Sequence, residues 1–214
     1  MEVERLPRKA REKAFHRSQI LAVALELFKE KGYHNVSIHE IATKTEFSIG
    51  TLYKFFKNKE DLYSALIIEK AETVSQIVDE VLSKKDDIEN MVKSYIDAKT
   101  KVFKDNLDFI RILIIETQKE KGFEKKTHLG KVLHELHQEE LKKVASLLEK
   151  GIRQKKFKKL NPYHLSIALG GLIDGFMFNW LENSGSHPYE ADVSFITEVF
   201  FSGCLSPKKT NLSG

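Results

Sequence analysis

The sequence predicts an all-α protein, in which a small N-terminal unit of three helices precedes a larger helical domain, with about nine helices in total. Three observations carry this prediction. Apolar residues recur at helical spacing along most of the chain, helix-start and helix-stop signals separate these stretches, and no run shows strand-like alternation. With 214 residues, 41% of them hydrophobic, the chain can bury a core without a disulfide or a metal ion.

The N-terminal unit is predicted from its capping signals. A first helix covers residues 11–31, carries an apolar stripe and ends at Gly32. Ser37 and Glu40 form a capping box that opens a short second helix. After a break at residues 45–47, Ser48 caps another short helix that reaches residue 56.

The remaining chain is predicted to form longer helices. Asn58 caps the first of them, and Asn161 followed by proline is a strong start signal for a later one. We therefore divide the chain into residues 1–59 (a basic arm and a DNA-binding domain with its reading head at residues 37–56), residues 60–206 (a helical ligand-binding and dimerisation domain) and residues 207–214 (a flexible tail).

The charge of the chain is concentrated at its N-terminus. The first 59 residues contain twelve Lys/Arg and seven Asp/Glu, whereas the rest contains twenty-three and twenty-four. The basic arm consists of Arg5, Arg8, Lys9, Arg11, Lys13 and Arg17. Such arms attract phosphate backbones by releasing counterions, although a solvated segment that aids solubility is the alternative.

The single cysteine, Cys204, excludes an intramolecular disulfide. We interpret it as a small apolar residue of a late helix, with a reactive thiol as the alternative. The N-terminus shows no signal peptide, and the most apolar stretch is too short and too polar to span a membrane. These features predict a cytoplasmic protein that does not associate with a membrane.

Two short helices joined by a three-residue break form a helix-turn-helix, whose second helix enters the major groove of DNA. Small residues at the start of this second helix, such as Gly50 and Thr51, allow a close approach, and the cations at its end are suited to phosphates. We expect DNA contacts from Ser37, Ser48, Ile49, Gly50, Thr51, Tyr53, Lys54, Lys57 and Lys59.

Residues 17–66 resemble the DNA-binding domain of TetR/AcrR-family transcriptional regulators. The resemblance rests on Ile20, Ala24, Leu27, Phe28, Gly32 and Tyr33, on Ile38, Ile41 and Ala42, and on the stretch from Ser48 to Leu62. One departure stands in the turn, where Glu46 replaces the family's usual glycine. A non-glycine residue in a left-handed conformation there costs roughly 1 kcal/mol, so either the turn is strained or its geometry differs slightly from the family's.

The resemblance implies an all-helical homodimer, in which ligand binding shifts the helix after the reading head and changes the separation of the two reading heads. Small residues at helical spacing also favour a dimer, because glycine in the middle of a helix lowers its stability, and close packing against another helix usually offsets this cost. The expected interface residues are Ala168, Gly171, Gly175 and Asn179. Close packing inside one subunit is the alternative.

A ligand pocket is expected among the central helices. The candidate lining residues are Tyr95, Phe103, Phe109, Ile112, Glu116, Phe176 and Trp180. Each aromatic or aliphatic member of this set is equally compatible with plain core, and Glu116 with an exposed position.

The sequence contains no phosphate-binding glycine loop and no arrangement of nucleophile and base, so we expect no enzyme and no cofactor. His134 and His137 miss the metalloprotease spacing by one residue. With His128, we interpret them as part of a solvated helix face. A small metallo-hydrolase remains as a third class of function. The favoured function is a repressor that binds a palindromic operator as a dimer and is released by a small apolar or amphipathic molecule. The alternative is a helical dimeric protein-interaction module without specific DNA binding.

Overall fold

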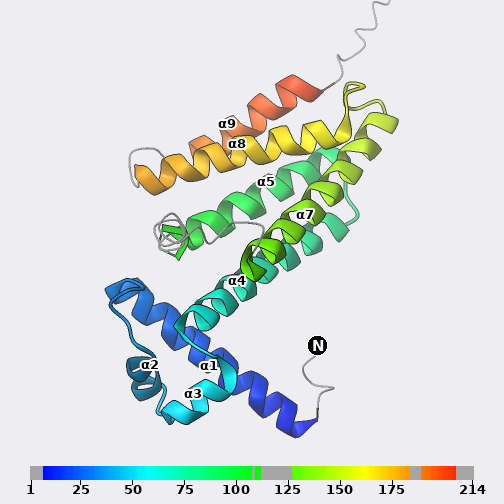
Figure 1. The fold of residues 1–214 in the computed structure, drawn as a ribbon. Coiled ribbons are helices and arrows are strands. Elements are labelled where there is room, and N and C mark those ends of the chain that lie inside the picture. Colours follow the sequence, from blue (N-terminus) through cyan, green and yellow to red (C-terminus); the bar gives the residue numbers. More distant parts are fainter. Residues whose placement is uncertain (1–6, 108, 112–126, 184–188, 206–214) are drawn as a thin grey trace, which may run out of the picture. The chain divides into compact units, whose positions relative to one another are not determined.

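The structure is a computed structural model that describes residues 7–107, 109–111, 127–183 and 189–205. Its helices in these ranges are α1 (Arg8–Lys31), α2 (Ile38–Lys44), α3 (Ile49–Phe55), α4 (Lys59–Ser83), α5 (Ile88–Asp105), α7 (His128–Arg153), α8 (Pro162–Glu182) and α9 (Tyr189–Cys204) (Figure 1). The β-structure found in the described ranges is one isolated bridge between Phe157 and Leu205, so the predicted all-α class is confirmed. None of the helices described is long and apolar enough to cross a membrane.

The chain divides into two compact units. Residues 1–71 and 108–132 form the first, and residues 72–107 and 133–214 form the second. The first unit therefore contains the predicted reading head together with the first half of α4. The predicted tail at residues 207–214 lies outside the described residues.

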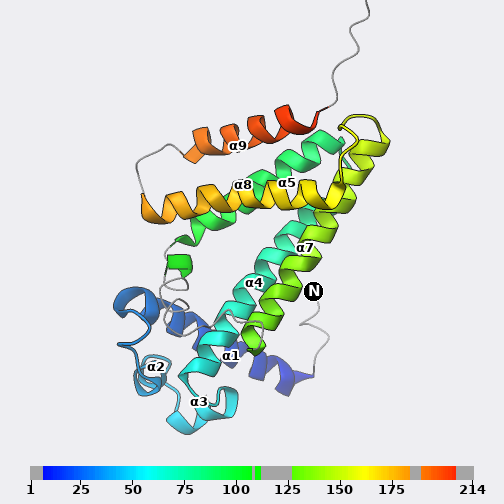
Figure 2. The same ribbon diagram turned by 45° about the horizontal axis from the view of Figure 1, so that its top comes forward.

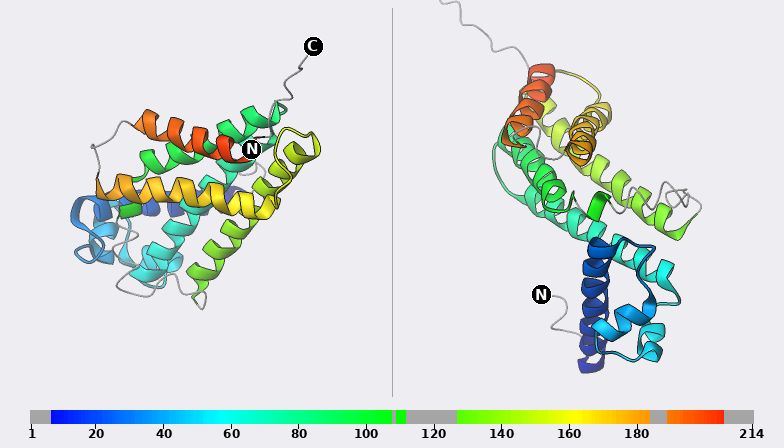
Figure 3. Two further views of the ribbon diagram at one scale, coloured as in Figure 1. Left: turned by 90° about the horizontal axis from the view of Figure 1, so that it is seen from above. Right: turned by 90° about the vertical axis from the view of Figure 1, so that its left-hand side faces the viewer.

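The first unit packs α1, α2, α3 and the start of α4 around one apolar core (Figure 3). Ile20, Ile41 and Leu62 come from three different helices, and each is fully buried. An aromatic group lies beside them, with ring centroids 5.4 Å apart for Phe28 and Tyr33 and 4.6 Å apart for Tyr33 and Tyr63. The burial of these side chains supplies most of the free energy that holds the helices of this unit together.

Side-chain caps fix where the short helices begin. The Ser37 hydroxyl accepts the backbone N–H of Glu40 at 3.1 Å, and the Ser48 hydroxyl accepts that of Thr51 at 3.1 Å. The pKa of Glu40 is lowered, first by a hydrogen bond from Lys31 and further by the backbone N–H of Ser37. The capping box predicted for α2 is thereby confirmed in both directions.

The turn between α2 and α3 is built around Glu46, which has a φ of 59°. This is the left-handed region, so of the two possibilities that the sequence left open the structure has the strained turn, at a cost on the order of 1 kcal/mol. The turn is held by two backbone hydrogen bonds, from Glu46 to Thr43 at 3.2 Å and from Phe47 to Ala42 at 3.1 Å. These bonds satisfy carbonyls at the end of α2 and offset part of the strain.

In the second unit, α5, α8 and α9 lie side by side, and the second half of α4 lies along α7 (Figure 2). Fully buried aliphatic side chains from several helices meet in its core: Val92, Ile96, Leu148, Leu169, Ile173 and Ile196. The Asn161 side chain accepts the backbone N–H of His164 at 3.0 Å, and Pro162 follows it as the first residue of α8. The predicted start signal of α8 is therefore confirmed.

The segment after α7 folds back onto the end of α9. Phe157 is 2% exposed and fills the space that a side chain at position 151 would need, because a Cβ built on Gly151 would lie 2.2 Å from its ring. The backbone N–H of Lys158 donates to the carbonyl of Cys204 at 2.7 Å. Burial raises the pKa of the Cys204 thiol to about 11, so it stays protonated near neutral pH and behaves as the small apolar residue that we predicted.

Candidate nucleic-acid interface

Helix α3 has one buried side chain and an outer face that faces solvent. Leu52 is 1% exposed and anchors the helix, whereas Tyr53 is 53% exposed and Lys54 lies beside it on the surface. Gly50 is exposed as well, and Ile49 and Thr51 are half-buried. The side chains that the sequence assigned to DNA therefore lie on the side of α3 away from the core.

The start of α3 is ordered by two hydroxyl groups. The Ser48 and Thr51 hydroxyls are hydrogen-bonded to each other at 2.8 Å, and Ser48 also caps the helix. This pair fixes the Thr51 side chain before any partner arrives. Each hydroxyl oxygen still has acceptor capacity that a base edge or a phosphate-bound water could use.

Within the described residues, no packing contact requires a glycine at position 50. A Cβ built there would meet only the Ser48 hydroxyl, at an ordinary 3.9 Å, and its φ is not in the left-handed region. The fold would thus accept alanine at this position. Because Gly50 has no side chain, another molecule can approach the backbone of α3 closely at this position.

Further polar groups border α3. Lys57 is exposed, and its backbone N–H donates to the Asp61 carboxylate at 2.8 Å, while Asn58 caps α4 by accepting the Asp61 N–H at 2.8 Å. This reciprocal pair fixes the path of the chain between α3 and α4. Ser37, at the start of α2, is exposed as well.

Lys59 differs from the prediction. Its ammonium donates to the carbonyls of Tyr33 at 3.0 Å, His34 at 3.5 Å and Val36 at 2.9 Å, and lies 4.3 Å from the centre of the Tyr33 ring. An ammonium has three N–H donors, and all three are directed at these acceptors. Lys59 therefore joins the start of α4 to the segment after α1, instead of projecting toward a phosphate. The sequence could not show this, because the acceptors are backbone atoms far away in the chain.

The residues predicted for the dimer lie on an uncovered face of α8. Ala168, Gly171 and Gly175 are exposed, Asn179 is half-buried, and no atom comes within 4 Å of a Cβ built on either glycine. The glycines therefore serve no close packing within the described part of one subunit. Large exposed apolar side chains flank them on α8 and α9: Ile167 (47%), Phe178 (52%), Phe195 (54%) and Val199 (39%).

The predicted pocket residues are divided between the units. Tyr95, Phe103, Phe176 and Trp180 belong to the apolar core of the second unit and its margin. Phe109 is buried but belongs to the first unit, and Ile112 and Glu116 lie outside the described residues.

A buried polar group that the sequence did not reveal lies beside these aromatic residues. Lys99 is 8% exposed and forms a hydrogen-bonded ion pair with Glu140, whose carboxylate also accepts the Tyr95 hydroxyl at 2.7 Å. Burial and the Glu140 charge raise the pKa of Tyr95 well above its usual value, so the phenol remains a neutral donor. Burial also raises the pKa of Asp174, against the opposing charges of Lys99 and His137.

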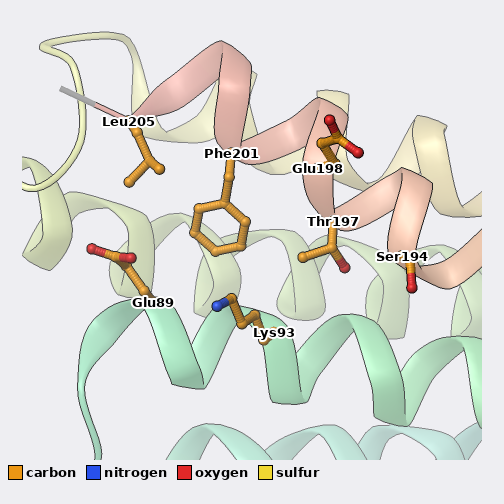
Figure 4. A pocket seen from close by; sticks show the side chains of 7 residues that line it. All are labelled: Glu89, Lys93, Ser194, Thr197, Glu198, Phe201 and Leu205. Atoms are coloured by element: carbon orange, nitrogen blue, oxygen red, sulfur yellow. The ribbon is translucent and has the colours of Figure 1, made fainter. Parts of the chain in front are cut away.

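An open groove of about 370 Å³ lies between α5 and α9 (Figure 4). Lys93 and Glu89 line it from α5, and the ammonium of Lys93 lies 5.7 Å from the centre of the Phe201 ring. The remaining lining residues are Ser194, Thr197, Glu198 and Leu205. None of the predicted pocket residues is among them.

Residues 20–66 match the family model of the bacterial regulatory proteins of the tetR family. The N-terminal part of the chain therefore contains the DNA-binding domain of the TetR family. The fatty acid metabolism regulator protein of Bacillus subtilis is 25% identical over 186 residues, which cover 86% of this chain and 93% of that protein. The resemblance predicted for this domain is confirmed, and the relatives support a DNA-binding transcriptional regulator.

Solved structures share the fold. A TetR/AcrR-family regulator from Thermobifida fusca aligns with a TM-score of 0.75 at 22% identity, covering 87% of this chain and 97% of that one. FadR from Bacillus subtilis in complex with stearoyl-CoA aligns with a TM-score of 0.69 at 23% identity, covering 87% and 98%. The prediction that the chain is not an enzyme is confirmed by its relatives, which are transcriptional regulators.

The two neighbouring lysines before and at the start of α4 can be separated by experiment. Lys59→Ala removes the ammonium that three carbonyls share, although the Tyr33 carbonyl keeps the backbone N–H of Val36 at 3.3 Å, so we expect it to lower the free energy of unfolding by about 1–3 kcal/mol. Lys57→Ala removes an exposed side chain and should leave that free energy within about 0.5 kcal/mol of the wild type. Urea denaturation followed by circular dichroism, without DNA, measures both. Equal stability of the two variants would contradict the role assigned to Lys59.

Proposed function

We propose that this TetR-family protein is a repressor, which binds a palindromic operator as a homodimer and is released by a small amphipathic molecule. Residues 1–59 would bind DNA, and residues 60–206 would bind the effector and form the dimer. The observation that carries the proposal is the outer face of α3, where Gly50, Tyr53 and Lys54 are exposed around a single buried anchor, Leu52.

The proposed division of labour on this face follows from chemistry. Packing within the described residues does not require a glycine at position 50. A glycine there would let the backbone of α3 approach the floor of the major groove, which would explain why one is present. Thr51 offers a hydroxyl and a methyl group to base edges. Tyr53, Lys54 and Lys57 are suited to phosphates, which fix orientation but carry no sequence information.

The proposed dimer rests on the uncovered face of α8 and α9. Ile167, Gly171, Gly175 and Phe178 follow one another at helical spacing, so their exposed groups form one stripe. In a two-fold interface the same stripe of both subunits meets itself, and the glycines permit close contact there. Two reading heads related by this axis would read two inverted half-sites.

The effector is proposed to be amphipathic. Phe103, Phe176 and Trp180 offer apolar surface in the second unit, and the Lys99–Glu140 pair offers a polar contact beside them. A relative is a fatty acid metabolism regulator, and FadR was crystallised with stearoyl-CoA. Long-chain acyl compounds are therefore the first class of effector to test.

Selection of bound duplexes from a random library tests the operator. We expect enrichment of a sequence with two inverted half-sites, and steep loss of binding with rising salt. Thr51→Ala removes a base-edge contact, so we expect the binding free-energy difference between the preferred base and the others at that position to change by about 1–3 kcal/mol. Tyr53→Ala should weaken binding to all sequences alike. No enrichment, with binding insensitive to salt, would support a protein-interaction module instead.

The double variant Ile167→Glu with Phe178→Glu tests the dimer. Four negative charges would meet across the proposed axis, so we expect a monomer in sedimentation and at least tenfold weaker binding to the full palindrome, a loss of about 1.4 kcal/mol or more. Leu160→Glu is the matched control, because Leu160 is 46% exposed but precedes α8. A double variant that remains dimeric would exclude this face as the interface.

The fluorescence of Trp180 reports effector binding, because it is the single tryptophan of the chain and lies among the proposed pocket residues. We expect stearoyl-CoA to change this fluorescence saturably, to release the operator, and to stabilise the protein by about 2.7 kcal/mol at a hundred times its Kd. Free coenzyme A is the control for the head group, and octanoyl-CoA for chain length. Equal responses to all three, or no response, would contradict a long-chain acyl effector.

A further inference from the structure

Helix α1 begins well before the segment that matches the family model. It begins at Arg8, twelve residues ahead of residue 20, where the match to the family model starts. The additional turns, residues 8–19, contain Arg8, Lys9, Arg11, Lys13 and Arg17 but only one acidic residue, Glu12. These turns place a compact positive charge on the first unit, which also holds α3.

The two faces of these turns differ in what they adjoin. Lys9, Lys13, His16 and Ile20 follow one another at spacings of four, three and four residues, so they share one face of α1. Ile20 is fully buried in the core, and the His16 ring lies 5.0 Å from that of Phe47, in the turn directly before α3. The middle of α1 accordingly lies beside the turn that leads into α3 (Figure 3).

Lys9 and Lys13 extend this face beyond the core by two turns. Both are exposed, and neither has an ion-pair partner among the described residues. Arg17, by contrast, is occupied, because it donates to Glu69 at 2.8 Å and stacks 5.7 Å from the Phe56 ring.

The other face of the same turns also carries two positive side chains, Arg8 and Arg11, but their surroundings differ. Arg8 pairs with Glu12 at 2.8 Å, which offsets its charge, and Arg11 lies near Phe15, which is 61% exposed. Neither arginine shares the face that packs on the reading head. The chain therefore contains its own matched control.

We propose that Lys9 and Lys13 contact backbone phosphates of the duplex just outside the bases read by α3, extending the DNA contact along α1. This inference rests on the proposed function, since it requires α3 to lie in the major groove. The strands that border the groove present a dense row of phosphates, and unpaired ammonium groups next to the reading head gain affinity by releasing counterions there. Because such contacts carry no base information, they raise affinity without changing sequence preference.

The test compares Lys9→Gln/Lys13→Gln with Arg8→Gln/Arg11→Gln in the full chain, using the duplex selected by the wild type. Both variants remove two positive charges from the same exposed helical turns. Because a bound dimer loses four lysines, we expect about hundred- to thousandfold weaker binding near 150 mM salt for the lysine pair, and a salt slope that is smaller by about 3.6. For the arginine pair we expect a loss of less than about threefold.

Selection from random duplexes should yield the same preferred sequence for both variants, and thermal unfolding should show that both fold like the wild type. Equal losses for the two pairs would mean that only net charge matters, and would overturn the proposal. Wild-type binding without sequence preference would instead overturn the operator claim. Binding of the wild type to anionic vesicles but not to any duplex would exclude both.

Discussion

A helix of seven residues cannot be stable by itself in water, yet α3 keeps its outer face exposed, as the proposed DNA contact requires. The rest of the first unit follows from this constraint. Only Leu52 is buried from α3, so its position depends on the Ser48 cap, on the turn at Glu46 and on the link between Lys57 and Asp61. The short helix is thus fixed at both ends by its neighbours and in the middle by one side chain.

Lys59 extends this support to α4. Its ammonium brings the carbonyls after α1 to the start of α4, and the aromatic rings of Tyr33 and Tyr63 pack beside the same contact. A cation that is satisfied by backbone carbonyls also carries positive charge beneath the interface without offering a donor to DNA. In the proposed function, phosphate contacts would therefore come from the exposed lysines Lys54 and Lys57.

The local features of this site could be predicted from the sequence. The caps at Ser37, Ser48 and Asn58 depend on residues within a few positions of one another, and the structure has all three. The sequence also located the unusual turn residue, Glu46, but left its conformation open, and the structure gives it a positive φ. The roles of Lys59 and Lys99 could not be predicted, because each depends on a partner dozens of residues away. A lysine in a charged segment reads as a surface residue unless the tertiary contact is known.

The Lys99–Glu140 pair raises a different question, because stability alone does not explain it. Removing two charges from water costs several kcal/mol per ion, and their attraction often only compensates for this loss. Apolar side chains of similar size would hold α5 to α7 at least as well. The pair also keeps the Tyr95 hydroxyl oriented and lies near the raised-pKa carboxyl of Asp174. Under the proposed function, an amphipathic effector that exchanges with one of these hydrogen bonds would account for a polar group in an otherwise apolar core.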